Sequence, residues 1–132
     1  MDAPELIVIT EQDRYRLQKL LEATRLDEKD AKSKQALREK LDETEPVFSE
    51  DIPPTIVTLN SRFTLRNLKT EVEQEYKLVL PTKADAKKRR VSILTPLGVV
   101  LLGLPEGATF ELADGPTLKV TKVHYQPEAV TA

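Results

Sequence analysis

The sequence predicts an α+β protein, in which a short N-terminal antiparallel helical hairpin precedes an antiparallel β-domain with one short helix. Apolar residues recur at helical spacing in the first third of the chain, and from residue 55 onward they follow a period of two. Three prolines between residues 45 and 54 separate the two patterns. We therefore expect the hairpin in residues 1–45, a linker in residues 46–54 and the β-domain in residues 55–132.

The composition excludes several classes of function. The net charge of −2 over 132 residues gives no global attraction to nucleic acid or to an anionic membrane. The absence of cysteine excludes disulfides and thiolate metal sites. The longest apolar run, residues 97–104, is far shorter than the roughly 20 residues that span a bilayer, and no basic region precedes an apolar core at the N-terminus. We expect a cytoplasmic protein with no metal, cofactor, membrane partner or small-molecule substrate.

Two narrow apolar stripes predict the helices. Residues 6–9 are a β-branched run, expected as an edge strand or as a segment packed beside the helices. Thr10 and Asp13 resemble a capping box, so the first helix should start at Glu11. A second helix is expected over residues 31–44. The stripes consist of Leu17, Leu20, Leu21 and Thr24 on the first helix, and of Leu37, Leu41 and Thr44 on the second. A short connection makes the pair an antiparallel hairpin, each helix about 21–24 Å long.

The β-domain should contain about five strands. We expect strands over residues 56–59, around Phe63 and Leu65, up to Leu80, and over residues 91–94, 109–112 and 118–125. A bend is expected at Asn60-Ser61, a hairpin turn over residues 67–70 and a polar loop over residues 81–90. In the last strand the apolar parity changes between Val120 and Val123, which predicts a bulge or a strong twist.

Residues 91–107 are expected to supply the centre of this domain. Proline cannot continue a sheet ladder and disfavours a helical conformation at the residue before it, so strand and helix should meet at Thr95-Pro96. The helix that follows has no polar face, so we expect it to be covered on all sides. It contains none of the residue types that usually perform catalysis, which argues against an enzyme.

Four separated segments of this domain resemble, in the same order, the C-terminal domain of the Gre factors. They are residues 56–61 (IVTLNS), 79–81 (VLP), 92–103 (SILTPLGVVLLG) and 123–129 (VHYQPEA). The Asn60-Ser61-Arg62 step and residues 125–129 are more similar to one branch of the family, the regulator of nucleoside diphosphate kinase (Rnk) branch. The helical part resembles the family in layout more than in residues.

The resemblance implies an FKBP-like β-domain that docks on bacterial RNA polymerase at the rim of its secondary channel, with the hairpin pointing into the channel. In Gre factors a long coiled coil carries two tip carboxylates to the catalytic magnesium and stimulates cleavage of backtracked RNA. Residues 23–30 of this chain lack the family's Gly-Asp-Leu-Ser-Glu-Asn tip signature, and the hairpin is shorter. We therefore expect a transcription regulator that competes with Gre factors and does not stimulate RNA cleavage, with only indirect proximity to RNA or DNA.

The hairpin tip carries three acids, Asp27, Glu28 and Asp30. Carboxylate oxygens are ligands that Mg²⁺ prefers, so a Gre-like elongation factor acting through these acids is one alternative. The other interpretation, which we favour, is that Asp27 or Asp30 caps the second helix and the remaining acids lie at its positive end.

Thr95, Pro96 and Leu97 resemble the loop through which Gre C-terminal domains touch the polymerase. An equally weighted alternative is a strand-to-helix junction needed only for folding. If the contact exists, Thr95→Glu or Pro96→Asn should lower polymerase binding while the melting temperature hardly changes.

Two further features have ordinary interpretations. A dense basic run could lie along RNA or an acidic protein surface, but no aromatic residue interleaves it, and we favour a solvated loop. Its members are Lys83, Lys87, Lys88, Arg89 and Arg90. His124 is the single histidine, so a three-histidine zinc site is impossible and an ordinary strand role is favoured.

Two functions of other classes remain open. The FKBP-like fold suggests a peptidyl-prolyl isomerase, but fold analogy is weak support and aromatic residues that would line such a pocket are few. A plain interaction module with an unrelated partner is the second.

Overall fold

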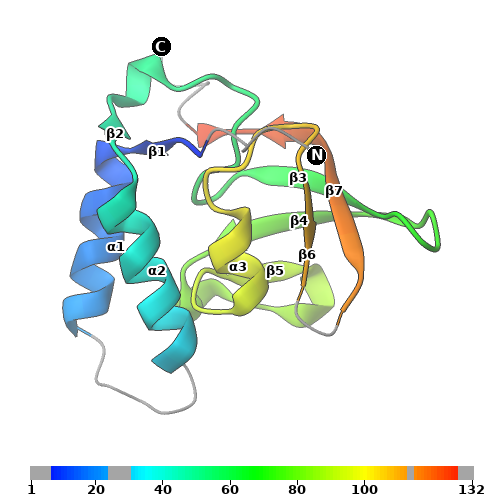
Figure 1. Cartoon of the computed structure of the whole chain (residues 1–132), viewed down its shortest axis with the longest axis horizontal. Helices are drawn as coiled ribbons and strands as arrows, with labels where there is room; N and C mark the ends of the chain where they lie inside the picture. The colour runs from blue at the N-terminus through cyan, green and yellow to red at the C-terminus, as the bar shows by residue number, and fades with distance from the viewer. Residues whose placement is uncertain (1–6, 24–30, 113–114, 128–132) are drawn as a thin grey trace.

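The computed structural model describes residues 7–23, 31–112 and 115–127. Two helices, α1 (Glu11–Ala23) and α2 (Ala31–Glu43), lie side by side on one flank of the molecule, and a sheet forms the other flank (Figure 1). A short helix, α3 (Pro96–Leu101), lies between them in this view and contacts α2. The mixed helix-and-sheet class predicted from the sequence is therefore confirmed.

Helix α1 begins where the capping pattern predicts. The backbone N–H of Asp13 donates a hydrogen bond to Thr10 Oγ1 at 3.0 Å, which satisfies one of the N–H groups left free in a first helical turn. Leu17 and Leu21 are buried on this helix. Helix α2 ends at Glu43, one residue before the predicted end, and buries Leu37 and Leu41. Thr44, the third residue of the predicted stripe, follows the helix and is half-buried.

A two-stranded parallel sheet lies at one end of the helix pair. Strand β1 (Ile9–Thr10) pairs with β2 (Pro46–Val47), so Ile9 is the one described residue of the predicted N-terminal run that lies in a strand, and this strand is beside the helices and outside the main sheet. After β2 the chain forms a 3-10 helix, η2 (Ser49–Asp51). Ile52, the next residue, is buried. The predicted linker region is thus fixed against the body of the protein by pairing and by burial.

Among the residues that the structure describes, the main sheet has five strands in the order β5-β4-β3-β7-β6. Their bounds are β3 (Arg62–Asn67), β4 (Glu73–Val79), β5 (Arg90–Ser92), β6 (Thr109–Glu111) and β7 (Thr117–Tyr125). Long strands β3 and β7 lie near the centre and three-residue strands form both edges. Short edge strands leave few unpaired backbone groups, which limits pairing with other chains.

The expectation of an antiparallel β-domain is wrong for one pair of strands. Strand β5 runs parallel to β4, with Lys77 opposite Arg90 and Val79 opposite Ser92. A parallel neighbour needs a connection that returns to the starting end of the first strand. Two 3-10 helices, η3 (Pro81–Lys83) and η4 (Ala86–Lys88), lie in this connection, which sequence analysis predicted only as a polar loop.

The prediction of a strand over residues 56–59 is also wrong. Only Ile56 makes an isolated bridge, to Pro105. The N–H of Val57 donates to the carbonyl of Leu104 at 2.9 Å, and the Val57 carbonyl accepts from Gly103 at 2.8 Å. Ile56 and Val57 therefore pair with the chain that follows α3. The side chains of Ile56, Val57 and Leu59 are buried in hydrophobic clusters.

The predicted irregularity of the last strand is confirmed. The pairing of β3 with β7 shifts register twice, between Arg62 and Phe63 and between Thr64 and Leu65. Phe63 lies opposite Val123 while Leu65 lies opposite Val120, so β7 contains an extra residue between these pairs. Each extra residue reverses the face to which later side chains point, which explains the change in apolar parity.

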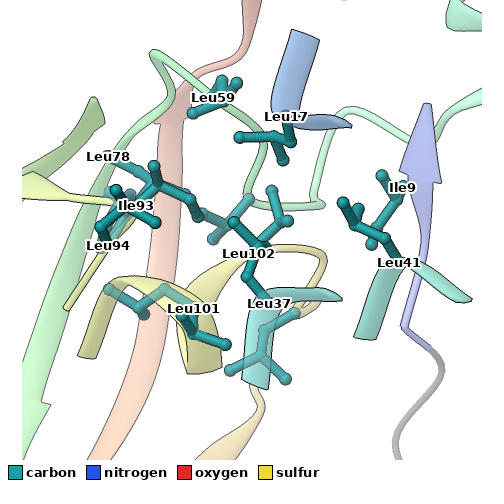
Figure 2. Packing of buried hydrophobic residues seen from close by; sticks show 14 of the residues in the cluster. Ile9, Leu17, Leu37, Leu41, Leu59, Leu78, Ile93, Leu94, Leu101 and Leu102 are labelled. Atoms are coloured by element: carbon teal, nitrogen blue, oxygen red, sulfur yellow. The ribbon is translucent and has the colours of Figure 1, made fainter. Parts of the chain in front are cut away.

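One hydrophobic cluster joins the helix pair to the sheet domain. Leu17 and Leu37 from the helices are fully buried together with Leu101 of α3 and Phe63 of β3. Figure 2 shows Leu37 of α2 next to Leu101 and Leu102, with Leu41 facing Ile9 of β1. Because these side chains share one core, the helix pair packs against the sheet domain through an apolar contact.

Candidate docking site at the start of helix α3

Thr95 fixes the turn from β5 into α3. Its hydroxyl donates to the carbonyl of Ser92 at 2.7 Å and accepts from the backbone N–H of Gly98 at 3.0 Å. The second bond is an N-cap, and Pro96 follows it at the first helical position, where its missing N–H costs nothing. Two hydrogen bonds of Thr95 and the restricted φ of Pro96 therefore define the turn.

Gly98 allows α3 to lie directly on the end of β5. A Cβ atom at this position would lie 2.1 Å from the carbonyl oxygen of Ser92 and 2.9 Å from Ile93 Cα. Both obstacles are backbone atoms, so no side-chain rotation can relieve the overlap. Glycine at this position is therefore required by close packing of helix on strand.

Pro96 and Leu97 lie where two grooves meet. Pro96 is exposed, whereas Leu97 and Val100 are half-buried. The first groove, of about 290 Å³, is lined by Lys32, Ser33, Ala36, Pro96, Val99, Val100, Glu111 and Leu112. The second, of about 420 Å³, is lined by Leu65, Asn67, Thr70, Val72, Gln74, Tyr76, Leu97, Leu112, Pro116 and Leu118. We call the first the α2–α3 groove and the second the sheet groove.

The grooves correct one expectation about α3. The helix is not covered on all sides, because Pro96 reaches solvent and Val100 faces the α2–α3 groove. Val99 and Leu101 are buried, as the apolar sequence predicts. The exposed apolar surface is thus confined to the first turn of α3 and to the side that faces α2.

Lys40 holds α2 against α3. Its ammonium group donates to the carbonyl oxygens of Val99 at 2.7 Å and Val100 at 3.1 Å, which are close to the C-terminal end of α3. A cation at this end also interacts favourably with the helix dipole. Burial lowers the pKa of Lys40 from its usual value of 10.5 to about 8. The lysine thereby sets the position of α2 beside the groove.

Asp13 holds α1 against the segment that precedes β3. Its carboxylate forms an ion pair with Arg16 and accepts a hydrogen bond from the N–H of Leu59 at 3.2 Å. Burial raises the pKa of Asp13, while the Arg16 hydrogen bond, the Arg16 charge and the Leu59 N–H act in the opposite direction. The sequence marks Asp13 as part of a capping box but gives no sign of the contact with Leu59, 46 residues away.

The remaining predicted site residues lie apart from the grooves or outside the described residues. Asp27, Glu28 and Asp30 are among the residues that the structure does not describe. Within residues 7–23, 31–112 and 115–127, no group of three acidic or histidine side chains is arranged to hold a metal ion. His124 Nε2 lies 2.6 Å from Thr64 Oγ1, a cross-strand hydrogen bond on the exposed face of the sheet. In the same described ranges, no helix is long and apolar enough to cross a membrane.

Comparisons with known proteins define the class. Residues 52–125 match the family described as "Transcription elongation factor, GreA/GreB, C-term". The chain belongs to this GreA/GreB C-terminal family, whose members include transcription-related regulators. It is 37% identical over 98 residues to the regulator of nucleoside diphosphate kinase of Escherichia coli strain K12, covering 71% of this chain and 72% of the relative.

Two further relatives extend the comparison. The GreA elongation factor of Hyphomonas neptunium is 30% identical over 77 residues, covering 58% of this chain and 49% of that protein. The solved structure of a GreA/GreB elongation factor from Nitrosomonas europaea superposes with a TM-score of 0.76 at 33% identity, covering 93% of this chain and all of that one. The similarity to that structure therefore includes the helix pair as well as the sheet.

Proposed function

We propose that this protein is a transcription regulator that binds bacterial RNA polymerase at the rim of the secondary channel and competes there with Gre factors. Family membership over residues 52–125 is the observation that carries the proposal. The proposal includes the FKBP-like character of the sheet domain and the division into residues 1–45, 46–54 and 55–132. The cytoplasm, where the polymerase works, is the proposed location.

The docking surface that we propose is the first turn of α3 with the α2–α3 groove. Pro96 is exposed at the edge of this groove, and Val99 and Val100 give it apolar walls. Ala36 of α2 lines the opposite side. A partner side chain that enters the groove would contact α2 and α3 together, so docking would also fix the direction of the helix pair.

We further propose that the bound protein does not stimulate RNA cleavage. Helices α1 and α2 have 13 residues each, or about 20 Å at 1.5 Å per residue. Gre factors, as the resemblance implies, reach the catalytic magnesium with a longer coiled coil. A shorter pair that lacks the Gre tip signature would occupy the channel entrance without delivering carboxylates to the metal.

The docking surface is tested with variants that leave the fold intact. Pro96→Asn and Ala36→Glu change exposed positions, so each should alter the free energy of unfolding by less than about 0.5–1 kcal/mol. Both should weaken binding to purified bacterial RNA polymerase at least about tenfold, equivalent to 1.4 kcal/mol. Pro54→Asn and Thr55→Glu, at exposed positions outside both grooves, are the matched controls.

Binding is measured by fluorescence anisotropy of the labelled protein, and stability by urea unfolding of the same samples. The docking proposal is contradicted if Pro96→Asn and Ala36→Glu bind as tightly as the two controls. Thr95→Glu is unsuitable for this test. The Thr95 hydroxyl makes two hydrogen bonds in the turn, so its replacement would lower stability as well as binding.

A further inference from the structure

The loop between β4 and β5, together with the first residue of β5, presents the densest positive charge of the described chain. Lys83, Lys87, Lys88, Arg89 and Arg90 are all exposed. None of these five forms an ion pair with another described residue, although Arg16, Arg62 and Arg66 do. We call these five residues the basic loop. Its cations are free to interact with a partner, in a protein whose net charge is −2.

The basic loop is held in one conformation by its own backbone. The N–H of Asp85 donates to the Arg90 carbonyl at 3.1 Å, and the N–H of Arg90 donates back to Asp85 at 2.9 Å. The Asp85 carboxylate caps η4 by accepting from the Lys87 N–H, and Arg89 closes the turn in the left-handed conformation at φ 53°. The backbone that carries these side chains is therefore held by hydrogen bonds within the loop.

The same bonds determine the kind of ligand that the loop can take. Within residues 83–90, every backbone N–H except that of Ala86 is a donor to another atom of the protein. Free N–H groups build the backbone part of many phosphate and nucleotide sites, and this loop does not offer such a group of N–H donors. The five long side chains are therefore the main groups that this loop offers to an anion, and exposed cations on long side chains suit a ligand with many regularly spaced charges.

We propose that the basic loop is a sequence-independent contact for the phosphate backbone of a nucleic acid. Duplex DNA carries one charge per about 1.7 Å of its axis, roughly twice the density of an extended acidic peptide at about 3.3–3.6 Å per residue. One strand alone carries a charge per about 3.4 Å, so charge density favours a duplex as the ligand. Three of the five cations are lysines, which bind phosphate as point charges and need no fixed bidentate geometry. The loop contains no aromatic residue, so it contacts backbone and does not stack on bases.

The test measures binding of the whole protein to a 20-base-pair DNA duplex and to a 20-nucleotide RNA, over a series of salt concentrations. If five phosphates are contacted, the slope of log K against log salt should be about −4.5 for duplex and about −3.5 for single-stranded RNA. The triple variant Lys83→Gln, Lys87→Gln, Lys88→Gln should lower these magnitudes by about 2.7 and about 2. Duplex and RNA arms distinguish which nucleic acid is preferred.

Three controls make the result decisive. Lys32→Gln, Lys69→Gln, Lys122→Gln removes the same charge from other exposed positions and should leave the slopes nearly unchanged. Replacing Lys83, Lys87 and Lys88 by Arg keeps the charge and should keep binding. Thermal melting followed by circular dichroism checks that every variant folds. If the Gln triple variant does not fold, the double variant Lys87→Gln, Lys88→Gln replaces it, with an expected loss of about 1.8 in duplex slope.

The proposal is overturned if both Gln triple variants weaken binding equally. It is also overturned if a 20-residue poly-glutamate peptide displaces the nucleic acid at equal charge concentration, because that result indicates a generic acidic protein partner. The measurement uses no polymerase, so its outcome is independent of whether the docking proposal holds.

Discussion

Lys40 shows how one side chain fixes the position of α2, a helix whose existence but not whose packing is predicted from the sequence. Its ammonium group joins α2 to two carbonyls near the end of α3, 59 and 60 residues further along the chain. Leu37 and Leu41, which precede and follow it on α2, are buried, and the charged end of the lysine reaches α3. The wall of the α2–α3 groove depends on this link.

Replacing Lys40 by Met removes the link and keeps most of the apolar stem. Two carbonyl groups of α3 then lose their donor, so we expect the free energy of unfolding to fall by about 1–3 kcal/mol. Urea unfolding measures the change. Lys32→Met, at an exposed position of the same helix, should change stability by less than about 0.5 kcal/mol. Equal losses in both variants would show that the Lys40 hydrogen bonds contribute nothing.

The lowered pKa of Lys40 also predicts a pH dependence. Its pKa is about 8 in the folded protein and 10.5 in the unfolded chain, so between these values the unfolded state binds more protons at this site. Stability contributed by Lys40 should therefore rise as the pH increases from 8 to 10.5. The difference in unfolding free energy between wild type and Lys40→Met isolates this group, because the other titrating residues are common to both. A difference that stays constant over this range would contradict the prediction.

Short sequence patterns predict contacts between residues that are close in the chain. They do not predict contacts between residues that are far apart in the chain. Thr10 and Asp13 are three residues apart, and their capping contact is readable from the sequence. The contact of Asp13 with Leu59 and that of Lys40 with α3 are absent from any local pattern. Thr95-Pro96 is an intermediate case: the break follows from proline chemistry, but the grooves beside it depend on where α2 and the sheet pack.

At the scale of elements, the junction of β5 and α3 leaves no room for a side chain at residue 98. We predict that Gly98→Ala lowers the free energy of unfolding by about 1–3 kcal/mol, since the new methyl group meets backbone atoms of Ser92 and Ile93. Pro96→Ala, on the exposed side of the same helix, is the control. Thermal or urea unfolding that ranks Gly98→Ala no worse than Pro96→Ala would refute this description of the junction.

The elements also show which patterns can be interpreted without a structure. The change of apolar parity in β7 predicts a bulge correctly, because a register shift must reverse the faces of a strand. An apolar run such as residues 56–59 predicts burial, which is observed, but it does not say which partner satisfies the backbone. The parallel pairing of β5 depends on the folded connection before it, and its 3-10 helices are too short to be recognised in the sequence.

At the scale of the whole molecule, three features that are separate in sequence form one arrangement. A shared core fixes the helix pair against the sheet domain, Lys40 places α2 beside α3, and Pro96 lies exposed at the groove between them. A partner that binds this groove therefore determines where the helix pair points. For this reason we propose that docking at the polymerase channel directs the helix pair inward.

Competition with a Gre factor for RNA polymerase, combined with an RNA-cleavage assay, tests the central claim most directly. Increasing amounts of this protein are added to polymerase complexes that hold backtracked RNA and a labelled Gre factor. We predict that the labelled Gre factor is displaced and that cleavage falls to the rate of polymerase alone, while Pro96→Asn displaces it at least about tenfold less effectively. Retention of the Gre factor at saturating protein, or cleavage that this protein itself stimulates, would contradict the account.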